Sequence, residues 1–113
     1  MHELSLVTAM VQQIEAIMKK EGAKQLESVS MAIGALSGVE PESFAFCFPL
    51  VIEETPLKGA KLIIDKIPLR LGCLHCGQAT EPDDLWMVCP LCGSSQVEVV
   101  TGRELTLTAL DLC

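Results

Sequence analysis

The chain has 113 residues, half of them hydrophobic, and fifteen acidic against eight basic residues give it a net charge of −7. A surface of this sign repels phosphate backbones and anionic lipids, so neither nucleic acid nor a membrane is an expected partner. The length suits one modest domain with room for a small attached module.

The sequence also bears on the cellular compartment. No apolar run approaches the roughly 20 residues that span a bilayer, and the first residues lack the basic start and apolar core of a signal peptide. We therefore expect a cytoplasmic protein. In a reducing compartment the six cysteines are not expected to form a disulfide framework, and their spacing favours metal or redox chemistry.

The N-terminal segment has helical periodicity. Apolar residues recur at steps of three and four between Leu4 and about Lys20, which predicts an amphipathic helix that begins almost at the first residue. Glu3 lies in its opening turn, where the helix dipole favours a carboxylate. Gly22 is a plausible stop, because glycine readily adopts the conformation that ends a helix.

Two strands and a second helix are expected next. Alternation of apolar and polar residues predicts a strand over about residues 26–36. Pro41 can occupy the first turn of a helix, which Pro49 should kink or shorten. Another strand is expected over residues 60–68. Because a strand–helix–strand unit is a crossover, these two strands are predicted to be parallel neighbours.

Residues 71–96 differ from the rest, with glycines, prolines, four cysteines and few large apolar residues apart from Trp86. Such a segment cannot hold a core without a staple. Strand-like alternation returns over residues 97–108 and is expected to rejoin the main sheet. The predicted fold is α/β: a small mixed β-sheet with two helices, formed by residues 1–70 and 97–113, plus an inserted zinc-ribbon-like module.

The cysteines of this module form a repeat. C-x-x-C-G occurs twice, and each copy offers two thiolates from one tight turn, while its glycine lets the chain bend away behind a metal. Together they supply the four ligands of a tetrahedral Zn(II) site: Cys73, Cys76, Cys89 and Cys92. Four thiolates leave no open position for a substrate or water, so the zinc is expected to be structural.

Other interpretations of the cysteines are less well supported. Thioredoxin-like redox chemistry uses a single C-x-x-C at a helix start. A ribbon that reads nucleic acid would carry basic residues, whereas Glu81, Asp83 and Asp84 lie between the pairs. Outside the module, Cys47 is expected to be a small buried apolar residue. Cys113 is expected to be an exposed thiol with no role that we can derive.

The start of the chain offers a second kind of metal site. The amine of Met1, the backbone nitrogen of His2 and the Nδ1 atom of its imidazole can chelate one ion, and Ni(II) or Cu(II) prefers such planar nitrogen donors. In the first turn of a helix the backbone N–H groups have no intrahelical partner, so deprotonating one costs little structure. The alternative is that His2 is simply a frayed terminal residue.

The fourth ligand of such a site is left open by the sequence. Glu3, solvent and His75 are candidates. His75 would couple the site to the zinc module, and the alternative for this residue is an exposed position in the first C-x-x-C turn.

Five stretches together resemble the HypA/HybF family of hydrogenase maturation proteins. They are the opening Met1–Ser5, the segment Ile33–Pro41, the two C-x-x-C-G motifs and the stretch Thr101–Leu105. The resemblance covers the whole chain. It implies a nickel metallochaperone, not an enzyme, that carries Ni(II) to NiFe-hydrogenase during maturation and in some lineages also serves urease.

The resemblance also implies ligands and partners. Nickel ligation maps to His2 with nearby backbone nitrogens and with Glu3 beside it, and structural Zn(II) ligation maps to the four cysteines of the module. The implied partners are a HypB-type GTPase and the precursor of the hydrogenase large subunit, and a homodimer is left open. The alternative function is a zinc-ribbon adaptor without nickel chemistry.

Overall fold

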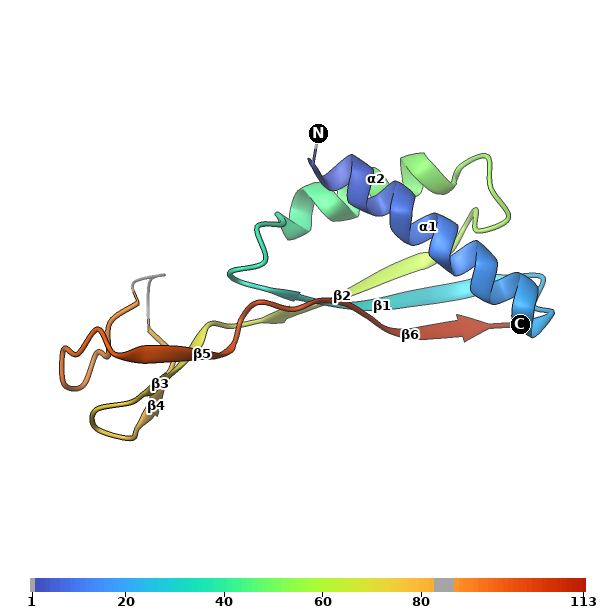
Figure 1. The fold of residues 1–113 in the computed structure, drawn as a ribbon. Coiled ribbons are helices and arrows are strands. Elements are labelled where there is room, and N and C mark those ends of the chain that lie inside the picture. The colour runs from blue at the N-terminus through green and yellow to red at the C-terminus, as the bar shows by residue number, and fades with distance from the viewer. Residues whose placement is uncertain (1, 83–86) are drawn as a thin grey trace. The chain divides into compact units, whose positions relative to one another are not determined.

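A computed structural model of the protein describes residues 2–82 and 87–113, without the side chain of His2 (Figure 1). The chain divides into two compact units. The first comprises Met1–Met31, Val39–Asp65 and Leu107–Cys113, and the second comprises Ala32–Gly38 and Lys66–Thr106. Within the described residues, no helix is both long enough and apolar enough to cross a membrane.

The first unit opens with helix α1, His2–Glu21. Its inner face buries residues at the predicted three- and four-residue steps, namely Val7, Met10, Val11, Ile14 and Met18. Gly22 ends the helix with a φ of 69°, and the N–H of Ala23 donates to the carbonyl of Met18 at 2.9 Å. This is a glycine-terminated helix end, as predicted.

Helix α2, Pro41–Ile52, packs against α1. It buries Phe44, Cys47, Phe48 and Ile52. Pro49 was expected to kink or shorten the helix; the shortening is wrong, because α2 continues three residues beyond it, and the kink stays a prediction. Ala45, whose carbonyl loses its helical donor to the proline, is exposed, so water can satisfy this carbonyl.

Three strands form the sheet in the order β2-β1-β6, with β1 at Leu26–Gly34, β2 at Lys61–Ile67 and β6 at Leu105–Leu112. Strands β1 and β2 run in the same direction in Figure 1, as predicted for a crossover unit. Strand β6 runs against β1, since Gly34 N–H donates to Glu104 and Leu36 N–H to Gly102. The sheet is therefore mixed.

The second unit holds a separate antiparallel sheet in the order β4-β3-β5, with β3 at Arg70–Cys73, β4 at Ala79–Thr80 and β5 at Val97–Thr101. The expectation that residues 97–101 rejoin the main sheet is wrong, because β5 pairs with β3 instead. Cys73 faces Val97 in this register. The chain entering the cysteine module and the chain leaving it thus lie side by side, and alternation along β5 could not reveal which strand would be its partner.

Two glycines of the second unit bring β1 and the loop before β6 into close contact. Leu36 N–H donates to the carbonyl of Gly102 at 2.6 Å, and a Cβ at Gly34 would collide with the backbone of Gly102. Gly102 itself has a φ of 125°, which disfavours a side chain. Glycine is thus required at both positions.

Replacing Gly34 by alanine should therefore lower the free energy of unfolding by about 2–3 kcal/mol, because rigid backbone must shift to admit the methyl group. Urea denaturation followed by circular dichroism measures the change. Gly72→Ala is a matched control on β3, where the added methyl group would meet mainly side-chain atoms of Val100 and Glu98. Equal stability of the two variants would contradict the close contact.

Candidate metal centre

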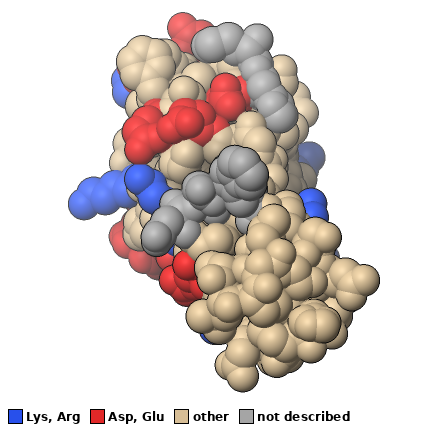
Figure 2. Space-filling view, turned by 90° about the vertical axis from the view of Figure 1, so that its left-hand side faces the viewer, with Lys and Arg blue, Asp and Glu red and all other residues tan. Residues whose placement is uncertain are grey.

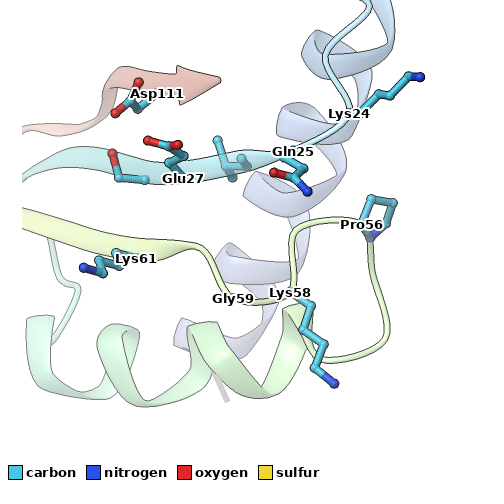
Figure 3. Close-up of a pocket in the computed structure, with 10 residues that line it drawn as sticks. Lys24, Gln25, Glu27, Pro56, Lys58, Gly59, Lys61 and Asp111 are labelled. Carbon is cyan, nitrogen blue, oxygen red and sulfur yellow. The ribbon is translucent and has the colours of Figure 1, made fainter. Parts of the chain in front are cut away.

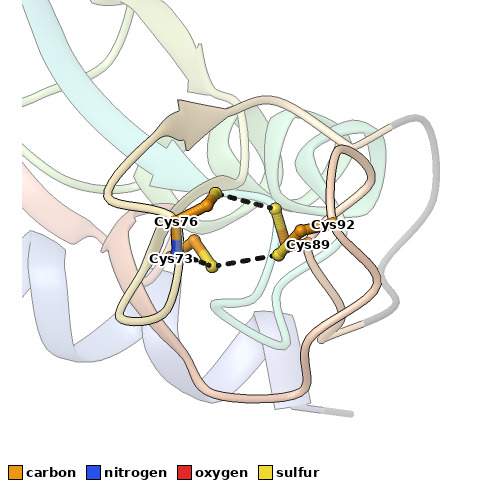
Figure 4. Close-up of side chains that lie close together, drawn as sticks. All are labelled: Cys73, Cys76, Cys89 and Cys92. Atoms are coloured by element: carbon orange, nitrogen blue, oxygen red, sulfur yellow. Dashed lines mark hydrogen bonds between the residues drawn. The ribbon is translucent and has the colours of Figure 1, made fainter.

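The four cysteines of the repeat gather in the second unit (Figure 4). Their sulfur atoms all lie within 4.8 Å of one another, with Cys73 and Cys92 3.6 Å apart and Cys76 and Cys89 3.8 Å apart. Zinc–sulfur bonds of about 2.3 Å in a tetrahedron place the sulfurs about 3.8 Å from each other. The donor set and its spacing therefore fit Zn(II).

Each cysteine pair sits on a turn of the same design. The N–H of Cys76 donates to the Sγ atom of Cys73 at 3.3 Å, and Gly77 N–H donates to the Cys73 carbonyl at 3.0 Å. In the second turn Gly93 N–H donates to the Cys89 carbonyl at 2.8 Å. Gly77 and Gly93 have φ values of 76° and 77°, so each closes its turn in a conformation that favours glycine.

Hydrogen bonds distribute negative charge unevenly over the sulfurs. The backbone N–H of Cys76, with that of His75, lowers the pKa of Cys73 to about 6, although burial raises it. The backbone N–H of Ser94 lowers the pKa of Cys92, but burial and the other three thiols together raise it to about 12. One thiolate, that of Cys73, therefore forms readily. Binding of a divalent cation would displace the protons from the other cysteine sulfurs.

The metal centre lies in a part of the chain without charged side chains. Residues 71–80 and 87–97 contain no Asp, Glu, Lys or Arg. Figure 2 shows a broad area of the surface without such side chains. Glu81 forms an exposed pair with Arg70 at 3.8 Å. Asp83, Asp84 and Trp86 lie outside the described residues.

The N-terminal residues belong to the first unit. Helix α1 already includes His2, so the backbone nitrogen of His2 lies in the first helical turn, where N–H groups have no intrahelical acceptor. Met1 and the side chain of His2 lie outside the described residues. Glu3 is half-buried, and its Oε2 atom accepts the backbone N–H of Glu40 at 3.4 Å.

This contact between Glu3 and Glu40 was missed by the sequence reasoning. Glu40 is the N-cap residue of α2 and makes no capping hydrogen bond with its own side chain. The carboxylate of Glu3 thus lies at the start of two helices, where both dipoles favour negative charge. The only signal was that Glu3 lies in the first turn of one helix and Glu40 directly precedes another, and this does not predict that the two helix starts meet.

The N-terminal residues and the four cysteines both fall within a match to a known protein family. A family model described as "Hydrogenase/urease nickel incorporation, metallochaperone, hypA" matches residues 1–112. The chain belongs to this HypA family.

Relatives and solved structures agree with this assignment. The "Hydrogenase maturation factor HypA" of Nitrosospira multiformis is 38% identical over 112 residues, covering 99% of this chain and 97% of the relative. The factor of the same name from Aquifex aeolicus is 36% identical over 112 residues, covering 99% of this chain and 97% of the relative.

The fold is shared with HypA solution structures. The structure of the "Ni metallochaperone HypA from Helicobacter pylori" matches with a TM-score of 0.66 and 28% identity, covering 97% of this chain and 96% of the other. A second HypA solution structure matches with a TM-score of 0.73 and 31% identity, covering 100% and 97%. The fold predicted from the sequence, with two helices, a small mixed sheet and a zinc-ribbon-like module, is confirmed.

The remaining candidate residues of this HypA-family chain have distinct environments. His75 is exposed and lines a shallow pocket of about 500 Å³ together with Cys92. Cys47 is buried on α2, as predicted. Cys113 is exposed, and its thiol donates to Glu27 at 2.9 Å, a bond that raises the pKa of Cys113.

A larger groove of about 720 Å³ lies in the first unit (Figure 3). Its charged lining consists of Lys24, Lys58 and Lys61 with Glu27 and Asp111. The described lining contains neither cysteine nor histidine, so this groove lacks the nitrogen and sulfur donors that suit nickel or zinc.

Loss of one metal-centre cysteine should release the zinc. Cys73→Ser and Cys92→Ser are each expected to purify with much less than one zinc per chain, because three thiolates no longer complete the site. Atomic emission spectrometry measures the metal, and amide exchange should rise in β3 and β5. Cys113→Ser, a matched cysteine away from the cluster, should retain zinc. Full zinc occupancy in Cys73→Ser would contradict the assignment.

Proposed function

We propose that this protein is a nickel metallochaperone that carries Ni(II) to NiFe-hydrogenase during maturation. The observation that carries the proposal is the match of the HypA family model over residues 1–112, so that both the N-terminus and the cysteine module fall within it. The relatives named hydrogenase maturation factor HypA support it at nearly full length.

The proposed nickel ligands are the amine of Met1, the backbone nitrogen of His2 and its imidazole Nδ1. Three nitrogens from adjacent positions form fused chelate rings in the plane that Ni(II) prefers. Because α1 includes His2 in its first turn, deprotonation of this backbone nitrogen breaks no intrahelical hydrogen bond. The site is at an end of the chain rather than in a closed cage, which suits a carrier that must release its ion.

Glu3 completes the proposed surroundings of the ion. Its carboxylate offsets the unfavourable effect of the helix dipole on a cation at this end of α1. The bond from Glu40 N–H uses Oε2, so Oε1 is the oxygen available to the ion or its water. The fourth ligand is Glu3, solvent or His75.

The zinc has a different proposed role. In the cysteine module, residues 71–96, four thiolates surround Zn(II) and leave no position for a substrate. This metal stabilises the fold, whereas nickel binding belongs to residues 1–70 and 97–113. The protein is accordingly a carrier and not an enzyme.

Delivery requires other proteins. We propose a HypB-type GTPase and the precursor of the hydrogenase large subunit as partners in the cytoplasm, with urease as a further recipient, and a homodimer as one state of the free protein. The family description names hydrogenase and urease with nickel incorporation, which supports hydrogenase and urease as recipients.

Nickel affinity tests the N-terminal site. Isothermal titration should give weaker Ni(II) binding by at least about tenfold for His2→Ala and for protein with one residue added before Met1. The first change removes the imidazole, and the second moves the terminal amine out of the chelate.

His75→Ala tests whether this histidine is the fourth ligand. Equal affinity in the native protein, His2→Ala and the extended protein would reject the N-terminal site and favour a zinc-ribbon adaptor without nickel chemistry. A loss in His75→Ala as well would assign His75 as a ligand.

A further inference from the structure

Helix α2 exposes an apolar strip that the proposed metal sites do not use. Phe46 is 70% exposed and Leu50, one turn later, is 63% exposed. Ala45 and Pro49, which lie beside them on the helix, are also exposed. We call these four residues the α2 strip.

The α2 strip is more than scattered surface apolarity. Single exposed apolar side chains are common, but two large ones at positions i and i+4 form a continuous ridge on a helix. The opposite face of α2 is buried, with Phe44, Cys47 and Phe48 each no more than 2% exposed. The strip is therefore held on a rigid element and presents anchors spaced for an apolar groove.

The charges around the strip are all of one sign along the helix. Glu42 precedes Phe46 by one turn, Glu53 and Glu54 follow Leu50, and α2 contains no Lys or Arg between Pro41 and Ile52. Lys58 pairs with Glu53 at 3.2 Å, but both side chains are 64% exposed. An exposed pair of this kind is weak, so an incoming cation can replace Lys58.

We propose that the α2 strip is the docking surface for a partner protein that offers an apolar groove with Lys or Arg at its rim. The apolar ridge requires a groove, and the acidic ends of the strip require a basic rim. A second copy of this chain is disfavoured because two-fold pairing would bring the same glutamates together. An anionic membrane is disfavoured for the same electrostatic reason.

The test uses the HypB-type GTPase as the binding probe, and this choice rests on the proposed function. Surface plasmon resonance is run with the full-length chain loaded with zinc. Phe46→Ala and Leu50→Ala should each weaken binding by about thirtyfold, as expected for truncation of a central anchor. Ile63→Ala is the matched control, because Ile63 lies in the first unit on β2 and is 53% exposed.

A charge reversal tests the rim separately. Glu54→Lys should slow association and make the affinity less dependent on salt, whereas Glu21→Lys at the end of α1 should leave both unchanged. All the substituted side chains are exposed, and that of Glu54 lies in the turn after α2, so circular dichroism should show native folding.

Several outcomes would overturn the proposal. One is equal partner affinity of the native protein, Phe46→Ala and Leu50→Ala. Another is a dimer of the native protein that is lost in Phe46→Ala, measured by light scattering, because the strip would then be a self-association surface. Nickel titration of Phe46→Ala separates this failure from failure of the metallochaperone function. If Phe46→Ala keeps the native nickel affinity but loses partner binding, the docking surface is supported. If Phe46→Ala also loses nickel affinity, the docking surface is contradicted.

Discussion

Contact among four cysteine sulfurs is the interaction on which the second unit depends. Its sheet is small, since β4 has two residues and β3 has four, and its buried side chains include two of the cysteines themselves. So little apolar burial cannot offset the entropy of ordering the chain. A metal that joins the turn after β3 to the turn before β5 supplies this missing stabilisation and also explains why these two strands pair.

The first unit is stabilised by a different principle. Aliphatic and aromatic side chains of α1 and α2 are buried at helical spacing, and both helices cover one face of the sheet in Figure 1. This core fixes α1 along its length, up to a first turn that contains His2. The proposed nickel site is at the start of this helix, where an ion could be passed to a partner.

The two metals thus illustrate opposite requirements. The zinc ligands come from two turns, each closed by a glycine, and together they surround the ion. The proposed nickel ligands come from consecutive residues at one end of a helix and cover only part of the ion. Thiolates favour retention of a structural ion, whereas a partly open nitrogen set favours exchange. The α2 strip would add the protein–protein contact that such an exchange needs.

Local features of the sequence determined much of this protein. Helical faces, tight turns and chelate rings are local structures, formed by residues that are near one another in the chain. The sequence therefore predicted the helical spacing of α1, the C-x-x-C-G turns and the chelating arrangement proposed for His2. Long-range contacts were decided only by the tertiary structure. Alternation marked β5 as a strand but could not show that its partner is β3. An acidic residue at the start of each helix could not show that Glu3 meets Glu40. Phe46 and Phe48 are chemically identical, yet one is 70% exposed and the other 2%, because burial depends on which side of α2 faces the core.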